Sequence, residues 1–161
     1  MKAPLTIGLT GVVVLVDQIT KAVALSRLSP GQILPVSPGF NLTLSFNEGA
    51  SFGMMSGLMA GRPLLMAALT GALALMFAYM ALRARTLRER IGLALIVGGA
   101  LGNIVDRLRQ GAVTDFLDLY WRDAHWPTFN AADIAISLGA LLILTGTLRP
   151  TISRGPASDQ S

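Results

Sequence analysis

Long apolar runs alternate with short polar segments along the chain. The apolar runs cover residues 5–25, 63–82, 91–108 and 130–148. A helix needs about 20 mostly apolar residues to cross the hydrocarbon core of a bilayer, and each run reaches or approaches that length. The pattern therefore predicts an all-α integral membrane protein with four transmembrane helices.

The segment between the first two runs has a different pattern. Residues 40–46 alternate apolar and polar side chains with a period of two, which is typical of a half-buried strand. Residues 32–36 are suited to pair with this strand. We therefore expect a small extracytoplasmic β-sheet between helices 1 and 2. A turn at residues 47–53 follows, and then an apolar segment at residues 54–60 that lies on the membrane surface or forms an ordinary connecting loop.

The composition also indicates a membrane protein. Hydrophobic residues make up 52% of the chain and charged residues 14%, whereas soluble domains carry about a quarter charged residues. The absence of cysteine excludes disulfides and thiolate metal sites, and a single histidine, His125, argues against a zinc hydrolase. We therefore expect no metal and no cofactor.

The basic residues predict the orientation. The net charge of +4 does not indicate nucleic acid as a partner, because the arginines flank the apolar runs as topology signals do. Short cytoplasmic loops collect Lys and Arg, and four crossings place these residues on one side: Lys2, Arg83, Arg85, Arg88, Arg90, Arg149 and Arg154. We therefore expect both termini and a polar tail at residues 151–161 in the cytoplasm, with residues 26–62 and 110–128 outside.

Asp17 and Lys21 interrupt the first apolar run. Their i,i+4 spacing, with the acid nearer the N-terminus, places both on one helix face as a favourable ion pair. The pair serves either as structural pairing inside a bundle or as a direct substrate contact, and the pattern leaves both roles open.

Helix direction decides at which side of the membrane each polar residue emerges. The predicted first and third helices end outside, and the fourth begins there. Several polar residues are therefore expected to meet near the outer leaflet, beside the turn at Asn47: Asp17, Lys21, Asn103, Asp106, Arg107, Asp115, Asn130 and Asp133. One polar site near the external surface accounts for all of them.

Asp115 and Asp133 are the candidates for chemistry at this site. A carboxylate near hydrocarbon is costly unless it is paired or lines a wet cavity, so each is either functional or part of a buried ion pair. Two carboxylates in a poorly solvated site do not both ionise cheaply, so one keeps its proton and the other becomes a base. Such a pair provides the acid and base groups of an aspartic protease.

Other polar residues near this pair are assigned supporting or surface roles. Asn130 shares a helix face with Asp133 and is placed to orient a carboxylate or to hold a peptide. Arg107 is placed to neutralise charge or to bind a lipid phosphate. Asp118 and Asp123, in the external segment, are interpreted as solvated surface acids.

The main alternative is a small proton-coupled membrane transporter, in which intramembrane acids relay protons. The acids here gather toward one side instead of crossing the bilayer, and the sequence shows no repeated half of the kind common in transporters. A purely structural membrane subunit is a second alternative. It gives no reason for two acids beside two asparagines at one depth.

Four motifs carry a resemblance to a known family. They are Asp17-x-x-x-Lys21; Phe46-Asn47-x-Gly49-Ala50-x-Phe52-Gly53; Asn103-x-x-Asp106-Arg107-x-x-x-Gly111-x-Val113-x-Asp115-Phe116; and Phe129-Asn130-x-Ala132-Asp133. They occur in order and cover nearly the whole chain. The chain resembles lipoprotein signal peptidase, also called signal peptidase II.

The resemblance implies an aspartic endopeptidase of the bacterial inner membrane. Such an enzyme removes the signal peptide of diacylglyceryl-modified prolipoproteins, cleaving before the lipid-modified cysteine. The resemblance also implies one membrane-embedded peptidase domain over residues 1–150, contact with membrane phospholipid and inhibition by globomycin. It assigns Asp115 and Asp133 as the catalytic dyad, and it assigns these residues to shaping the site: Asp17, Lys21, Asn47, Gly49, Asn103, Arg107 and Asn130. Gly49 and Gly53 would let the turn at residues 47–53 close as a lid.

Overall fold

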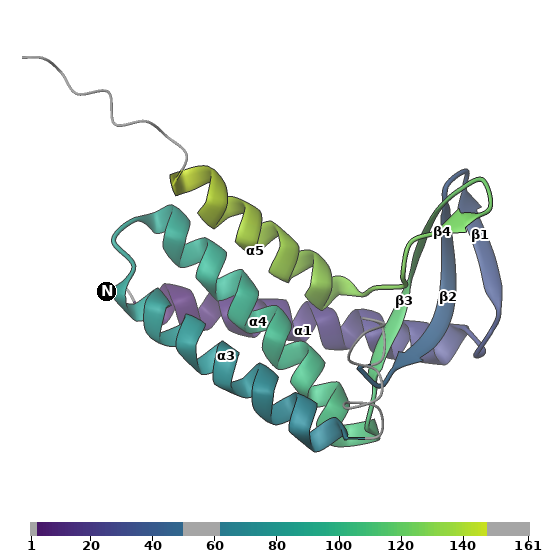
Figure 1. Cartoon of the computed structure of the whole chain (residues 1–161), viewed down its shortest axis with the longest axis horizontal. Helices are drawn as coiled ribbons and strands as arrows, with labels where there is room; N and C mark the ends of the chain where they lie inside the picture. Colours follow the sequence, from purple (N-terminus) through teal and green to yellow (C-terminus); the bar gives the residue numbers. More distant parts are fainter. Residues whose placement is uncertain (1–2, 50–61, 148–161) are drawn as a thin grey trace, which may run out of the picture.

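The computed structural model describes residues 3–49 and 62–147. In these residues the elements follow in the order α1 (Ala3–Arg27), β1 (Ile33–Ser37), β2 (Phe40–Asn47), α3 (Pro63–Arg83), α4 (Leu87–Gln110), β3 (Val113–Trp121), β4 (Ala124–His125) and α5 (Ala131–Thr147). Most of the predicted lid at residues 47–53, the segment at 54–60 and the tail at 151–161 lie outside the described residues. Figure 1 shows the helices as a bundle with the sheet at one end.

The four apolar runs are all helices, as predicted. By length and composition, α1, α3 and α4 are able to cross a membrane, while α5, with 17 residues, is shorter. Large apolar side chains point outward from the bundle, such as Ile7 at 69% and Leu64 at 71% exposure. Extended apolar surface of this kind marks contact with a membrane or a partner, so the outer face of the bundle suits a lipid environment.

The central helix of the bundle is α4, which packs against α1, α3 and α5. In its most apolar stretch 61% of the residues are buried, against 17% in α1 and in α3. Glycines let α5 approach closely, because a Cβ on Gly99 would collide with the Ala132 carbonyl and one on Gly139 with the Gly92 carbonyl. The start of α5, which carries Asp133, is therefore pressed against the middle of α4.

Both ends of α4 are capped by local interactions. Thr86 and Glu89 form a capping box, in which the Thr86 hydroxyl accepts a hydrogen bond from the Glu89 amide at 3.1 Å. At the other end Gly111 adopts a left-handed conformation (φ +81°), and its amide donates to the Arg107 carbonyl at 3.1 Å. This turn leads the chain directly from α4 into β3.

The sheet is antiparallel, with the strand order β1-β2-β3-β4. β1 pairs with β2, with Leu34 opposite Leu42, which confirms the predicted pairing of these two segments. On its other side β2 pairs with β3, with Ser45 opposite Asp115. The sheet therefore joins the segment after α1 to the segment after α4.

The prediction that the sheet lies between helices 1 and 2 is only half right. β3 and β4 follow α4 and belong to residues 110–128, for which no strand is predicted. β3 contains Asp115 and Asp118, and aspartate is depleted in strands, so local propensity does not reveal it. Pairing with the distant β2 stabilises this strand instead.

The sheet packs on the C-terminal end of α1 through a small apolar cluster of Ala24, Leu28, Leu44 and Phe116. Side chains alternate between the two faces of a strand. Because Phe116 faces this cluster, the neighbouring Asp115 faces the other side, toward the start of α5. The apolar packing on α1 thus orients Asp115.

Candidate active site

The two candidate catalytic aspartates come from different elements. Asp115 lies in β3, and Asp133 lies in the first turn of α5. Both line one pocket of about 290 Å³, together with Asn47, Asn103, Arg107, Val113, Trp126, Pro127, Thr128 and Phe129. The two carboxylates therefore face the same cavity.

Asp115 is almost completely buried, with 1% of its surface exposed. The side-chain amide of Asn130 donates to Oδ1 at 2.6 Å, and that of Asn47 donates to Oδ2 at 3.3 Å. Burial and the negative charge of Asp133 raise the pKa of Asp115 to about 6, against the opposing effect of the two hydrogen bonds. Asp115 thus holds a proton more readily than an ordinary carboxyl.

Asp133 is oriented by the start of its own helix. The Asn130 side-chain oxygen accepts a hydrogen bond from the Asp133 amide at 3.0 Å, and Oδ2 of Asp133 accepts one from the Asn130 amide at 3.2 Å. This reciprocal pair has the form of a capping box, with aspartate in place of the usual glutamate. The remaining oxygen, Oδ1, accepts a hydrogen bond from Asn103 at 3.0 Å.

Two asparagine side chains connect the aspartates. Asn130 is fully buried, and its side-chain nitrogen donates both to Asp115 and, at 3.2 Å, to the side-chain oxygen of Asn103. Asn103 in turn donates to Asp133. A continuous chain of hydrogen bonds therefore runs from one carboxylate to the other.

A buried ion cluster lies behind these asparagines. Nζ of Lys21 is 2.9 Å from Asp17, 3.0 Å from Asp106 and 2.9 Å from the side-chain oxygen of Asn103. The ion pair predicted from the i,i+4 spacing is therefore formed. Asp17 and Lys21 are 0% and 2% exposed and do not line the pocket, so the structure favours structural pairing over substrate contact.

Arg107 and Gly49 complete the set of residues selected from the sequence. Arg107 lines the pocket and lies close enough to Asp115 and Asp133 for electrostatic attraction. Gly49 adopts a positive φ of +97° that favours glycine, and its amide donates to the Asn47 side-chain oxygen at 2.8 Å. This contact holds the Asn47 side chain in place beside Asp115.

Some site residues were not singled out from the sequence. Trp126, Pro127 and Thr128 form one wall of the pocket together with Phe129, which belongs to the fourth motif. The backbone of Phe129 bonds to β3 and draws this loop over the cavity. Asp106 was expected near the site but had no specific role. The feature of the sequence that points to a role for Asp106 is its position in the third motif, which begins at Asn103.

The interpretation of Asp118 as a solvated acid is wrong. Asp118 is only 3% exposed, and it accepts a hydrogen bond from Asn41 at 2.9 Å and pairs with His125 at 2.9 Å. His125 also stacks on Tyr120. Asp123, in contrast, is exposed as expected. Pairing of β3 with β2 buries Asp118, and the sequence pattern did not predict this strand.

The pocket has the groups for acid–base chemistry. Two carboxylates face one cavity, and burial raises the pKa of one of them, Asp115, above that of an ordinary carboxyl. Such a pair can supply a base and an acid at the same time. In the part of the chain that the structure describes, no group of three or more His, Cys, Asp or Glu side chains is arranged to hold a metal ion.

The raised pKa predicts how Asp115→Asn changes stability with pH. Between its ordinary pKa of 3.8 and about 6, Asp115 binds more protons in the folded protein than in the unfolded chain. The wild type therefore loses up to roughly 3 kcal/mol of stability as the pH rises through this window. The asparagine variant does not titrate and avoids this loss.

Unfolding in detergent at about pH 4 and about pH 7 measures this effect. The free energy of unfolding of the variant relative to wild type should increase by the stated amount at the higher pH. A difference that stays constant across this range would contradict the assigned environment of Asp115.

Comparison with known proteins places the chain in context. It matches the family model described as Signal peptidase (SPase) II over residues 9–149. A lipoprotein signal peptidase of Burkholderia mallei (strain SAVP1) is 41% identical over 144 residues, which cover 89% of this chain and 87% of that protein. One from Geobacter metallireducens is 39% identical over 142 residues, covering 87% and 88%.

The likeness extends to solved structures. One is described as a bacterial membrane enzyme studied by the in meso method at 1.9 Å resolution, and it matches with a TM-score of 0.80 and 28% identity. The match covers 92% of this chain and 96% of that one. Fold and sequence therefore agree over nearly the full length of both chains.

Proposed function

Since the chain belongs to the signal peptidase II family, we propose that it cleaves diacylglyceryl-modified prolipoproteins by an aspartic mechanism, just before the lipid-modified cysteine. Membership makes the chain a multi-pass membrane protease that processes lipoproteins. The aspartic mechanism rests on one observation, the shared pocket of Asp115 and Asp133.

In the proposed reaction, the ionised member of the dyad takes a proton from a water molecule. The water oxygen attacks the scissile carbonyl carbon, while the protonated member donates its proton to the carbonyl oxygen. The resulting intermediate collapses and the peptide C–N bond breaks, as the departing amine takes a proton from the carboxyl that first acted as base. The other carboxylate takes back a proton from a hydroxyl of the intermediate, so the dyad again holds one proton. The raised pKa of Asp115 supports the proposal, because it lets this carboxyl take up and release a proton closer to neutral pH than an ordinary carboxyl does.

The other site residues have distinct proposed tasks. Asn47 and Asn130 hold Asp115, Asn103 holds Asp133, and Arg107 balances the charge that the dyad carries. Gly49 fixes the turn that places Asn47. Asp17 and Lys21 act behind the pocket.

We also propose that globomycin inhibits the enzyme, as it does the family, and that membrane phospholipid surrounds the bundle.

We propose that the chain forms one membrane-embedded peptidase domain over residues 1–150 in the bacterial inner membrane, with residues 151–161 as a cytoplasmic tail. Four crossings put both termini in the cytoplasm. Figure 1 shows the start of α1, the turn between α3 and α4 and the end of α5 at one end, opposite the sheet. Arg83 and Arg85 lie at this end, as the positive-inside rule requires.

Single cysteines test the orientation. Ser37 on the sheet and Arg85 in the turn before α4 are exposed and lie at opposite ends, so each is replaced by cysteine in turn. Arg85 is chosen because, unlike its neighbour Thr86, its side chain does not cap α4. An impermeant thiol reagent applied to intact spheroplasts should label only the first, and both after lysis. Equal labelling before lysis would contradict the orientation.

The activity itself is tested with purified protein and a diacylglyceryl-modified prolipoprotein. We expect release of the signal peptide, with a new N-terminus at the lipid-modified cysteine. The same precursor without the lipid is the control and should be cleaved far more slowly. A modified precursor that stays intact with folded protein would refute the proposed function.

A further inference from the structure

The backbone next to each candidate catalytic aspartate is held in the same way. The amide of the residue just before Asp115 donates to Oδ2 of Asp106 at 2.9 Å. The amide of the residue just before Asp133 donates to Oδ1 of Asp17 at 3.0 Å. One buried carboxylate therefore anchors the chain beside each member of the dyad. The two anchored residues are Thr114 and Ala132.

Lys21 joins the two anchoring carboxylates. Its Nζ lies 2.9 Å from Asp17 and 3.0 Å from Asp106, and its third hydrogen bond goes to Asn103, which holds Asp133. An ammonium group has three donors, so every donor of Lys21 is used within this network. The lysine thus has no freedom to move toward the pocket.

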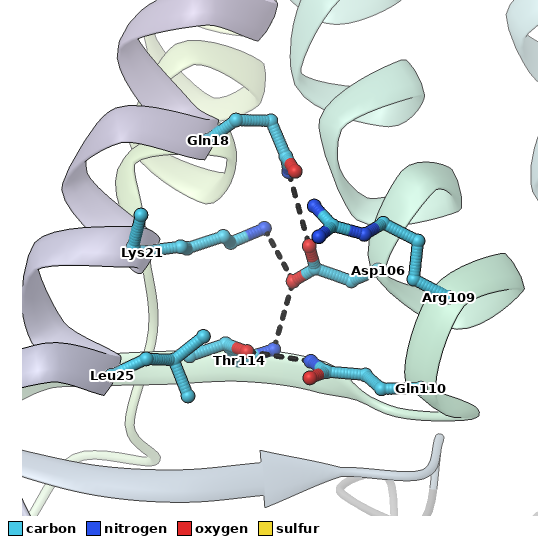
Figure 2. Close-up of a pocket in the computed structure, with 8 residues that line it drawn as sticks. Gln18, Lys21, Leu25, Asp106, Arg109, Gln110 and Thr114 are labelled. Carbon is cyan, nitrogen blue, oxygen red and sulfur yellow. Dashed lines mark hydrogen bonds and ion pairs between the residues drawn. The ribbon is translucent and has the colours of Figure 1, made fainter.

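Gln18 forms a second link between the same carboxylates. Its side-chain nitrogen donates to Asp17 at 3.1 Å and to Asp106 at 3.0 Å. Figure 2 shows Gln18 and Lys21, both from α1, reaching Asp106 from one side while the Thr114 amide reaches it from another. Asp106 therefore connects three elements, namely α1, α4 and β3.

This network lies outside the pocket that Asp115 and Asp133 share. Asp17, Gln18, Lys21 and Asp106 are all absent from the lining of the dyad pocket. Asp17, Lys21 and Asp106 are 0%, 2% and 5% exposed. These residues can therefore influence the reaction through the groups that they hold and, for Asp17 and Lys21, through the charges that they present to the dyad.

We propose that Asp17, Gln18, Lys21 and Asp106 form a positioning clamp that sets the separation of Asp115 and Asp133. Asp106 fixes the start of β3, Asp17 fixes the start of α5, and Lys21 with Gln18 holds the two carboxylates together. The clamp rests on the proposed function, because it matters for turnover only if the two aspartates act as a dyad. It assigns Asp106 and Gln18 a role in positioning.

A change in the length of one clamp residue should therefore change turnover without changing binding. Asp106→Glu keeps the charge and the acceptor oxygens but moves them by one methylene. A separate pocket of about 220 Å³ beside Asp106, lined by Gln18, Lys21 and Arg109 among others, gives the longer side chain room. The variant should fold, with the start of β3 displaced relative to α5.

The matched control is Asp118→Glu. Asp118 is also buried and belongs to β3 itself, but its partners are Asn41 and His125 and it does not line the dyad pocket. Displacement of reacting groups by about 1 Å can cost 10²-fold in rate, so we expect kcat to fall roughly 10- to 100-fold for Asp106→Glu with KM within about two-fold of wild type. The control should keep kcat within about two-fold of wild type.

The pH dependence of kcat/KM gives a readout that a smaller folded fraction would not change. The dyad is faced by Asp17 and Lys21 from α1 and by Arg107 from α4. Asp106→Glu alters none of these charges. A shift in the spacing of the two limbs of the profile therefore reports a changed separation of the aspartates, whereas partial unfolding only scales the profile.

If Asp106→Glu does not fold, a second variant, Gln18→Met, tests the clamp. Gln18 is half-buried between α1 and α4, so Gln18→Met should be tolerated while it removes one of the two links. We expect a loss of at least about three-fold in kcat with unchanged KM.

The outcomes separate the two claims. A wild-type protein that leaves the lipid-modified precursor intact would refute the proposed function. A wild type that cleaves, with a folded Asp106→Glu variant at wild-type kcat and an unshifted pH profile, would overturn the clamp alone. Where only Gln18→Met folds, wild-type kcat in that variant would overturn it in the same way.

Discussion

Replacing Asp133 with asparagine should abolish cleavage of a lipid-modified prolipoprotein while the protein still folds. Asparagine has nearly the same shape as aspartate but cannot accept the proton of the attacking water near neutral pH. It can still accept a hydrogen bond from the Asn130 amide, so the start of α5 remains capped. General acid–base groups contribute about 10²- to 10⁴-fold in rate, which sets the expected loss.

Asp115→Asn should cause a loss of the same size, because the two carboxyl groups act in the same step, one as base toward the water and the other as acid toward the carbonyl oxygen. Groups that work as a unit lose most of their effect when the first is removed. The double variant should therefore be scarcely slower than either single variant. The measurement is the rate of signal-peptide release by purified protein, with folding monitored by thermal unfolding in the same detergent.

Asp118→Asn and Asp123→Asn are the controls for this experiment. Both residues follow Asp115 in the segment between α4 and α5, and neither lines the dyad pocket. Asp118 is buried and Asp123 exposed, so the two variants separate the effect of losing a buried carboxylate from the effect of losing the dyad. If Asp133→Asn retained more than about a tenth of wild-type turnover, which lies well outside the expected range, the dyad assignment would be wrong.

Lys21→Met should destabilise the protein more than any other single change considered. It leaves Asp17 and Asp106, at 0% and 5% exposure, without the cation that lies within 3.0 Å of both. Removing one partner of a buried ion pair typically costs about 3–5 kcal/mol, because an uncompensated charge remains in a poorly solvated place. Chemical unfolding in detergent would measure this loss.

Arg109→Met is the matched control for Lys21→Met. Arg109 is exposed and lines the small pocket beside the same ion cluster, so its loss should change stability by no more than about 0.5 kcal/mol. Adding Asp17→Asn and Asp106→Asn to Lys21→Met removes the stranded charges and should restore much of the lost stability. A cost for Lys21→Met no greater than that of the control would show that the buried cluster does not stabilise the fold.

The sequence pattern alone was sufficient for the helices and for the first two strands. Residues 5–25 and the three other apolar runs predict helices because a membrane segment must satisfy its backbone hydrogen bonds internally, and helices do so. The strand at residues 40–46 can be recognised in the sequence because apolar and polar side chains alternate along it, so its two faces differ in polarity. The ion pair of Asp17 and Lys21 follows from helical geometry, since residues four apart lie on one face.

Much of the candidate site was also predictable. Helix direction alone places Asn103, Asn130 and Asp133 toward one end of the bundle, and the structure joins them by hydrogen bonds. Their roles in catalysis stay predictions. Each of these inferences uses contacts within one helix or the shared direction of several, which local sequence determines.

Tertiary structure decided the rest. β3 forms because β2 pairs with it across a long stretch of intervening sequence, and this pairing buries Asp118 and turns Asp115 toward the dyad pocket. Asp106 acquires its contacts only when α1, α4 and β3 meet. The hydrophobic periodicity of a segment indicates which of its faces is buried. It does not indicate which residues of another segment pack against that face.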